Sequence, residues 1–414
     1  MWLKQITHVK LLGCIFILSL SMIAADAMAI NGILFYGVGA RNRAMGGANG
    51  AAPVDSSTIL INPAGIGHLG NTADLGAHLL RAHRNMDTGE ATNPAGLVNT
   101  AAGNQTSNQE YYLTPTSGMT FRDPGSKWAF GGLIAGVAGE GASYKNARTV
   151  LGVNPDGSDF DTSSFLFIIK GIPAASYQVN DKLSVGAGLH INAALFSADA
   201  LTGELVETEG DGKLDIAYGV GAQIGVLYDF NDTWSVGASY TSEQWFQEFN
   251  LYDDLIPDFG LPPEYRVGVA YRPTDKLLLT ADYKLIQWTA LDLYDDSPAE
   301  GGFGWRDQHS FGVGAAYDFT SKITGRMGVN YAKTNIKKDS TFANALVPTV
   351  YETHLAIGGD WNFYKNNSIS FSVVRTLDND QKDNGNGDAF SQAGKGVEIG
   401  YDGWDADLVW TLKF

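Results

Sequence analysis

The stretch LSVGAGLHINAAL, residues 183–195, alternates between two kinds of side chain. Its odd positions are apolar: Leu183, Val185, Ala187, Leu189, Ile191, Ala193 and Leu195. The even positions up to residue 192 are small or polar: Ser184, Gly186, Gly188, His190 and Asn192. A helix would bring both sets to every side, whereas a strand keeps them on opposite faces. The stretch is therefore predicted to be a β-strand with one apolar face.

The same period of two recurs along most of the chain. It is clear in the segments Ile216–Phe230, Trp234–Tyr240, Leu277–Leu285, Phe311–Phe319, Ile323–Tyr331, Leu355–Phe363 and Trp404–Phe414. Short polar turns suited to tight hairpins separate such strands: Asp123–Gly125, Asn180–Lys182, Asn231–Thr233, Pro273–Asp275, Thr320–Lys322 and Lys365–Asn367. Counting around these turns gives about fourteen strands between Ala73 and Phe414, an even number as in single-chain bacterial barrels.

The opposite strand ends meet longer segments that we expect to be polar loops: Asn85–Ser107, Ala198–Gly212, Tyr294–Trp305 and Asp378–Lys395. Short turns on one rim and long loops on the other are typical of outer-membrane barrels. The turns recur roughly every 45 residues, which is also the period of a β-propeller blade. Each period holds two strands of about 11 residues, however, and that length suits a tilted membrane crossing. The fold class predicted is all-β, a transmembrane antiparallel β-barrel.

Composition agrees with this class. The chain has 414 residues, 50 of them Gly, with 11% aromatic residues and a mean hydropathy of only -0.10. After the first 29 residues it has no run of about 18 apolar residues, so a helical membrane protein is excluded. The formal charge of -17 argues against a nucleic-acid partner.

Residues 1–29 are predicted to be a cleaved secretory signal peptide. Lys4 and Lys10 form a positive n-region before an apolar run, Leu11–Ile23. Ala27–Ala29 offers a small-x-small cleavage site. The only cysteine, Cys14, lies in this run. A lipoprotein box at Cys14 is the less favoured reading, because the apolar stretch continues after it. With the favoured reading, a cleaved signal peptide, the mature chain has no cysteine and therefore lacks disulfides and thiolate chemistry.

Residues 30–70 are predicted to be a separate unit, a hatch, ahead of a barrel at 71–414. This segment is rich in Gly and Ala and does not alternate. It is too short to bury a core of its own. We expect it to fill the lumen of the barrel.

The motifs of this segment resemble those of the FadL/TodX family of outer-membrane transporters. They are an Arg-Ala-x-Gly-Gly stretch with Arg43, Gly46 and Gly47, an acidic and hydroxyl cluster with Asp55, and the triplet Asn62, Pro63 and Ala64. Further similar stretches are Asn231–Gly237 and Leu261–Gly268, so the resemblance covers essentially the whole mature chain.

The resemblance implies a monomeric barrel of fourteen strands, closed by the hatch, that carries long-chain fatty acids or other hydrophobic compounds. It also implies capture in an outer groove, an inner pocket, and sideways exit into the membrane near a kink in the third strand. This sequence departs from the pattern in its short segments Ala198–Gly212 and Leu251–Leu261. The groove is therefore open to doubt, and the substrate could be smaller than a long-chain fatty acid.

Strand parity predicts which side chains face the lumen. The inward cations, expected either to bind substrate or to form ion pairs within the wall, are Lys170, His190, Arg266, Lys284 and Arg326. Inward apolar residues suggest either a ligand pocket or contacts with the hatch: Ile168, Leu278, Ile286 and, less clearly, Trp288.

A sideways exit is predicted at the strand from Lys127 to Gly141. Its outer half is rich in glycine, including Gly136, Gly139 and Gly141. Glycine weakens strand pairing and permits bulges. Packing of these glycines against the hatch is the alternative.

No catalytic residue, metal site or cofactor is predicted. His309 and Ser310 are adjacent on a strand, so they face opposite sides and cannot act as a base and its nucleophile. The loop Asp378–Asp388 has calcium-like residues without the spacing of an EF-hand, and a solvated acidic loop is the favoured reading.

The function predicted is passive uptake of fatty acids or of aromatic or alkane hydrocarbons across the bacterial outer membrane. A general diffusion porin and a non-transport barrel such as an adhesin remain alternatives. The expected partners are a hydrophobic small molecule, outer-membrane lipid and lipopolysaccharide. The barrel-assembly machinery is also expected to be a partner, because Phe414 provides a terminal aromatic on an alternating strand.

Overall fold

The computed structural model describes residues 30–89, 103–144, 162–199 and 212–414. The predicted signal peptide lies outside the described residues. In the described ranges, no helix has the length and apolar character required to cross a bilayer.

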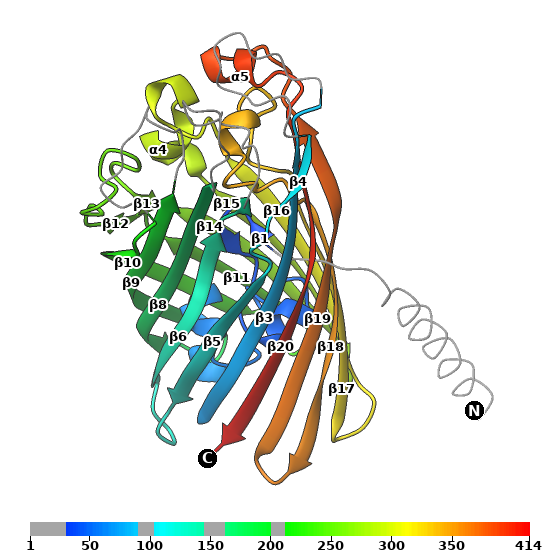
Figure 1. Ribbon diagram of the computed structural model, residues 1–414. Helices are drawn as coiled ribbons and strands as arrows, with labels where there is room; N and C mark the ends of the chain where they lie inside the picture. The colour runs from blue at the N-terminus through cyan, green and yellow to red at the C-terminus, as the bar shows by residue number, and fades with distance from the viewer. Residues whose placement is uncertain (1–29, 90–102, 145–161, 200–211) are drawn as a thin grey trace, which may run out of the picture.

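The chain forms a closed antiparallel barrel of 14 strands, as predicted (Figure 1). β20 pairs with β3 from Lys413 opposite Thr72 to Glu398 opposite Asp87, which closes the ring. The barrel strands are β3 (Thr72–Asp87), β5 (Tyr111–Phe121), β6 (Trp128–Glu140), β8 (Thr162–Gln178), β9 (Leu183–Asp199), β10 (Asp215–Asp229), β11 (Trp234–Thr241), β14 (Glu264–Thr274), β15 (Leu277–Ile286), β16 (Gln308–Asp318), β17 (Ile323–Ala332), β18 (Thr353–Tyr364), β19 (Asn367–Lys382) and β20 (Glu398–Lys413).

One end of the barrel, the turn end, carries the six predicted short turns, and the opposite end, the loop end, carries longer segments with short elements (Figure 1). The loop-end strands are β4 (Asn104–Thr106), β7 (Ser143–Tyr144), β12 (Gln244–Phe246) and β13 (Gly260–Leu261). The loop-end helices are η3 (Trp288–Ala290), α4 (Asp292–Asp295), η4 (Pro298–Glu300), η5 (Phe342–Asn344) and α5 (Ala389–Ala393).

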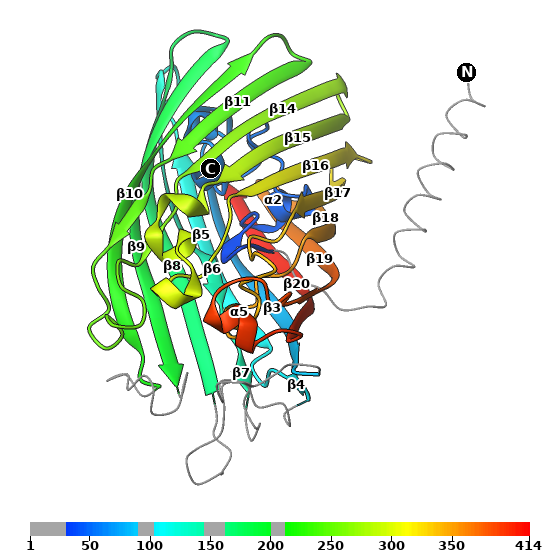
Figure 2. The ribbon, with the colours of Figure 1, turned by 90° about the horizontal axis from the view of Figure 1, so that it is seen from above.

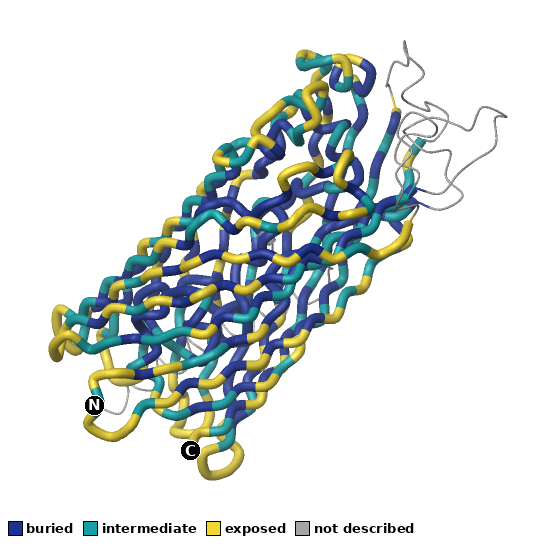
Figure 3. Tube along the Cα trace, turned by 90° about the vertical axis from the view of Figure 1, so that its left-hand side faces the viewer, coloured by how far each residue is buried: buried dark blue, intermediate teal, exposed yellow. Residues whose placement is uncertain are grey.

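Alternation along the strands has the predicted physical cause, since one face meets lipid and the other the interior (Figure 3). In β9, Leu189 and Ile191 are 50% and 51% exposed, whereas His190 between them is fully buried. In β20, Trp410 points outward and Asp405 is buried. Aromatic side chains gather at the turn end, where a girdle was predicted: Phe230, Trp234, Phe319, Trp361 and Tyr364 are all exposed.

Residues 30–70 lie inside the ring of strands (Figure 2). Their elements are β1 (Ile30–Asn31), β2 (Leu34–Phe35), α2 (Ala40–Ala44), α3 (Thr58–Ile61) and η1 (Pro63–His68). Helix α2 packs against β17 to β20, and η1 packs against β6 and β8 to β10, on the other side of the lumen. This stretch is called the N-terminal segment below.

Candidate functional site

The barrel wall is irregular where β6 leaves its neighbour β5. The two strands, both fully described, pair only as far as Thr116 and Ala135. On its other side β6 still pairs with β8, with a register shift directly after Gly136. A shift of this kind is a β-bulge, which bends the strand that carries it. The stretch over which β5 and β6 do not pair with each other, residues 111–115 of β5 and 136–140 of β6, is called the wall gap below.

Glycine is required at both ends of the bent part of β6. A Cβ at Gly136 would lie 2.8 Å from the Cβ of Thr114 across the wall gap. Gly141 has φ 152° and a Cβ there would overlap the carbonyl oxygen of Ser164. A Cβ at Gly139 would lie 3.2 Å from a backbone oxygen of β8. The three glycines of the predicted exit strand therefore lie at the wall gap.

The N-terminal segment supplies the backbone partner that β5 does not. Leu34 of β2 pairs with Ala138, and the amide of Gly139 donates to the carbonyl of Ile33 at 3.0 Å. Buried backbone groups need hydrogen-bond partners. The pairing therefore stabilises the inward bend of β6 and attaches it to a segment inside the lumen.

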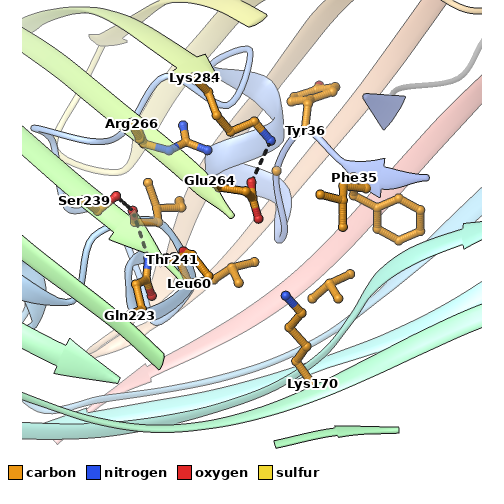
Figure 4. A pocket seen from close by; sticks show the side chains of 14 residues that line it. Phe35, Tyr36, Leu60, Lys170, Gln223, Ser239, Thr241, Glu264, Arg266 and Lys284 are labelled. Atoms are coloured by element: carbon orange, nitrogen blue, oxygen red, sulfur yellow. Dashed lines mark hydrogen bonds and ion pairs between the residues drawn. The ribbon is translucent and has the colours of Figure 1, made fainter. Parts of the chain in front are cut away.

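An inner cavity of about 40 Å³ lies between β2, α3 and the wall (Figure 4). Its lining combines apolar and polar side chains: Leu34, Phe35, Tyr36, Leu60, Ile61, Val137, Lys170, Gln223, Ser239, Thr241, Glu264, Arg266 and Lys284. This volume is close to that of one water molecule, about 30 Å³. A larger molecule would have to displace side chains in order to enter.

Three predicted cations, Lys170, Arg266 and Lys284, meet at this cavity. Two of them are already neutralised, because Lys284 lies 3.3 Å from Glu264 and Arg266 lies 2.9 Å from Asp282. The Lys170 side chain differs. It is only 2% exposed, lines the cavity, and has no ion pair or hydrogen bond to any residue that the structure describes.

The other predicted cations lie away from the inner cavity. His190 is fully buried, with its ring nitrogen 3.4 Å from the amide oxygen of Gln223. Arg326 lies 2.6 Å from Asp360, and the same carboxylate binds Arg41 of α2 at 2.8 Å. Arg326 therefore contributes to holding the N-terminal segment.

The predicted inward apolar residues lie in two places. Ile168 and Ile286 are fully buried in the main apolar cluster between the wall and the N-terminal segment. Leu278 packs against a second cluster that includes Ala51 and Ala64 of that segment. Contacts with the N-terminal segment thus account for Leu278.

Arg43 is the second arginine, beside Arg41, that anchors α2 to the wall. Arg43 is 1% exposed and lies 2.7 Å from Asp405 and 3.1 Å from Asp407, both on β20. His78 of β3 also contacts Asp405, at 2.7 Å. A buried charge requires a partner of opposite sign, and Arg43 has two.

The remaining motif residues shape the backbone of the N-terminal segment. Asn62 caps η1 by accepting from the amide of Ala64 at 3.2 Å, and Pro63 occupies the first turn of that helix. The Asn62 side chain also donates to the carbonyl of Val226, at 3.0 Å, in the wall. Asp55 accepts a hydrogen bond from the amide of Ser57 at 3.0 Å.

Gly46 and Gly47 have positive φ values of 65° and 73°, which glycine adopts without strain. A Cβ at Gly46 would overlap the carbonyl of Val329, so the segment lies directly on β17. The glycine pair is therefore required by close packing of one backbone on another.

A second cavity, the upper pocket, lies under the loop-end segments and also measures about 40 Å³. It is almost wholly apolar, and its lining is Ile33, Glu140, Ser164, Leu166, Phe196, Ile256, Phe259, Leu293, Tyr294, Phe303, Trp305 and Val347. Tyr294 and Trp305 stack at 4.9 Å. Burial raises the pKa of the Tyr294 hydroxyl, which stays protonated and donates to the carbonyl of Gly260 at 2.8 Å.

The expectation that Tyr294–Trp305 forms a polar loop was wrong at its two ends, although Asp295, Asp296 and Glu300 between them are exposed. Trp305 is fully buried and Tyr294 nearly so, because their rings pack on each other and on Trp288. The short segment Leu251–Leu261 also contributes, since Phe259 lines the pocket. The aromatic residues in these two segments indicated an apolar pocket. Their acidic neighbours in the sequence suggested a polar loop instead.

Glu140, at the end of β6, lies at the boundary between the upper pocket and the wall gap. It forms a buried ion pair with Arg84 of β3 at 2.7 Å. It also accepts from the hydroxyl of Tyr351 at 2.9 Å, which in turn contacts the carbonyl of Gly32. Burial raises the pKa of Tyr351 well above its ordinary value, so the hydroxyl stays a donor. No motif or spacing along the chain indicated this cluster.

Two other spaces lie near the wall gap, one at the gap on the lumen side and one on the lipid side next to its turn-end edge. On the inside, a narrow space with no room for a water molecule is lined by Phe35, Gly37, Val38, Gly39, Arg43, His78, Thr114, Thr116, Gly136 and Asp407. On the lipid side, a groove of about 810 Å³ is mainly apolar, and its large side chains are Leu75, Met119, Ile134, Ile191, Tyr218 and Trp410. This second space is called the outer groove below.

Two groups of residues are candidates for metal binding or catalysis, the acidic loop Asp378–Asp388 and the pair His309 and Ser310. In the parts of the chain that are described, no group of three or more His, Cys, Asp or Glu side chains could hold a metal ion. Asp383 is 3% exposed and accepts from the amide of Phe342 at 3.0 Å, so the reading of this loop as solvated was wrong at Asp383. Ser310 is buried, whereas His309 lies on the outer face beside Tyr283.

The fold and its interior define an outer-membrane transport barrel whose lumen is filled by its own N-terminal segment. The chain belongs to the family described as outer membrane protein transport protein (OMPP1/FadL/TodX), which it matches over residues 17–247 and 256–404. Members of this family and the structural neighbours are transport channels and not enzymes.

Similar known proteins include the 47 kDa outer membrane protein of Pasteurella multocida, 22% identical over 203 residues, 41% of this chain and 46% of that protein. Outer membrane protein P1 of Haemophilus influenzae is 26% identical over 176 residues, 38% of each chain. The chain thus spans less than half the length of these relatives.

Among solved structures, the fold resembles the Pseudomonas putida toluene transporter TodX, with a TM-score of 0.69 and 18% identity over 92% of this chain and 99% of that one. The Ralstonia pickettii toluene transporter TbuX gives 0.64 and 21%, over 92% and 99%. A Pseudomonas aeruginosa FadL homologue gives 0.64 and 16%, over 94% and 100%.

Proposed function

We propose that the protein carries small hydrophobic compounds passively across the outer membrane and releases them sideways into the bilayer. The route begins at the upper pocket, continues through the inner cavity, and leaves the lumen through the wall gap into the outer groove. In this proposal the N-terminal segment acts as the hatch that keeps water and ions from following.

The observation that carries this proposal is that the narrow space and the outer groove lie on opposite faces of β5 and β6 at the edge of the wall gap. Gly136 lines the narrow space on the lumen side, and Ile134, two residues before it on the same strand, lines the outer groove. On β5, Thr116 lines the narrow space and Ser117 lines the outer groove. At the turn-end edge of the wall gap, lumen and lipid are thus separated by the thickness of strands β5 and β6 alone.

Sideways release is favoured by the hydrophobic effect. Each methylene kept out of water is worth about 0.8 kcal/mol. A straight path into the periplasm would expose the whole molecule, whereas the outer groove offers apolar side chains that are already in contact with lipid. The lumen is also occupied by buried residues, which does not favour a general diffusion porin.

The lining favours neutral compounds, with a subsidiary place for one acidic group. The upper pocket is aromatic, and Arg266 and Lys284 are already paired with carboxylates. Lys170 is the cavity cation whose charge has no direct partner among the described residues. We propose it as the group that a fatty-acid carboxylate would contact. The names of TodX and TbuX as toluene transporters support small aromatic hydrocarbons as the main class.

The test restores the regular register of β6. Deleting Val137, the extra residue between Gly136 and Ala138, removes the bulge. Uptake of labelled toluene and oleate would be measured in cells that lack their own transporter. We expect both to fall to the level of cells without the protein.

A matched control deletes one residue from a turn, Asp275, away from the wall gap. It should leave uptake near that of the unaltered protein. Heat-modifiable migration on gels checks that both variants form barrels. A folded Val137 deletion that still transports at the original rate would contradict the sideways route.

A further inference from the structure

Resting on the proposed sideways route, we infer that Phe35 sets the size limit of the transported molecule, because its side chain closes the inner side of the wall gap. Two residues line both the inner cavity and the narrow space at the gap, Phe35 and Gly37. Glycine has no side chain, so the barrier between these two spaces is the Phe35 ring, which Figure 4 shows beside the inner cavity.

The ring is held by contacts with polar partners. It lies edge-on to His78, with centroids 5.3 Å apart, and the guanidinium carbon of Arg43 lies 5.7 Å from its centroid. Aromatic and cation–π contacts of this kind contribute about 0.5–1.5 kcal/mol each. The ring is also part of the main apolar cluster and is only 7% exposed, so it is fixed in place, and a molecule that moves it must replace this apolar burial with its own.

The backbone under the ring is also suited to movement. β2 has only two residues; it pairs with the equally short β1 and joins β6 only through the pair Leu34 and Ala138 and the neighbouring hydrogen bond from Gly139 to Ile33, whereas the wall strands form long ladders. So short a pairing is marginal by itself. Displacing Phe35 therefore does not require any wall strand to open.

The narrow space beyond the ring offers few apolar contacts to a passing molecule, because it is polar on one side. Arg43, Asp407 and His78 line it there, while Phe35 and Val38 are its apolar side chains. A hydrophobic molecule gains contact with the ring and little else. The space that the ring leaves when it moves therefore decides which molecules pass.

The experiment compares uptake of toluene with uptake of a bulkier two-ring hydrocarbon, biphenyl, in the full chain. Phe35→Ala should raise the biphenyl-to-toluene uptake ratio about tenfold, and Phe35→Trp should lower it, with Phe35→Leu in between. Leu60 lines the inner cavity but not the narrow space, so Leu60→Ala is the matched control and should change uptake of both compounds by the same factor.

A ratio that is unchanged across the Phe35 series, in variants that form heat-modifiable barrels, would overturn the inference. The same assay separates this from failure of the proposed function. If deleting Val137 abolishes uptake while the Phe35 ratio stays constant, the route stands and only the role of Phe35 falls. If the Val137 deletion transports normally, the route itself is wrong.

Discussion

Arg84 and Glu140 form a buried ion pair, with Nε 2.7 Å from Oε1, that joins β3 to the end of β6 across the intervening strand β5. The pair bridges the upper edge of the wall gap. It does so where no backbone ladder joins β5 to β6. The width of the gap at its upper edge therefore depends on two side chains.

Breaking this pair should destabilise the barrel. Removing one partner of a buried ion pair typically costs about 3–5 kcal/mol, because the other charge is left without compensation. Arg84→Met and Glu140→Gln should each lower the temperature at which the barrel unfolds on a heat-modifiability gel. The double variant Arg84→Met, Glu140→Gln should lower this temperature by less than the sum of the two single effects. Strict additivity would show that the residues act independently.

A staple across the wall gap should stop transport. The Cβ of Thr114 and a Cβ built on Gly136 are 2.8 Å apart, so the two strands must separate by about 1 Å before cysteines at both positions can form a disulfide, whose Cβ atoms lie about 3.8 Å apart. The sole cysteine of the chain, Cys14, lies in the predicted leader and would not interfere. Under oxidation, toluene uptake should fall at least about tenfold and should recover with a reductant.

The control staple joins Val329 and Leu355, registered partners on β17 and β18 far from the gap. It should have no effect on uptake in either redox state. Transport that survives the Thr114–Gly136 staple would argue for an exit elsewhere.

Removing the N-terminal segment should open the lumen to ions. Deleting residues 39–61 removes α2, α3 and the Arg43 anchor but leaves every wall strand in place. The conductance of the protein in planar bilayers should rise severalfold. Conductance equal to that of the full chain would mean that residues 39–61 do not seal the barrel.

Lys170→Met should separate acids from hydrocarbons. A desolvated carboxylate needs a charged partner, and one charge-assisted hydrogen bond is worth about 1.5–3 kcal/mol, or a change in uptake of at least about tenfold. Oleate uptake should fall by that factor, while toluene uptake should stay within about twofold. As a comparison, Lys284→Met leaves Glu264 without its 3.3 Å partner and should affect both substrates. Parallel losses for Lys170→Met would assign that residue to the wall alone.

The barrel could be predicted from the sequence because each wall residue meets one of two environments. Leu189 faces lipid and His190 faces the interior, and the alternation of apolar and polar residues along the strand predicts both orientations. The turns and the number of strands followed for the same reason.

The site was less accessible to prediction, because it depends on which distant residues meet. Parity places Lys284 inward, but only the register of β14 against β15 brings Glu264 within reach to neutralise it. The glycines marked β6 as weak, yet nothing local to residue 138 indicates that Leu34 is its partner. The upper pocket was missed because Tyr294 and Trp305 lie among acidic residues that were interpreted as a solvated loop.

The anchoring of Arg43 has a consequence for assembly. Its two carboxylates, Asp405 and Asp407, are on β20, the last strand in the chain and the one that seals the ring against β3. Until that strand is in place, Arg43 lacks both of the partners that neutralise it. A barrel in which β20 is not yet paired with β3 would therefore leave Arg43 without these partners, which couples docking of the N-terminal segment to closure of the wall.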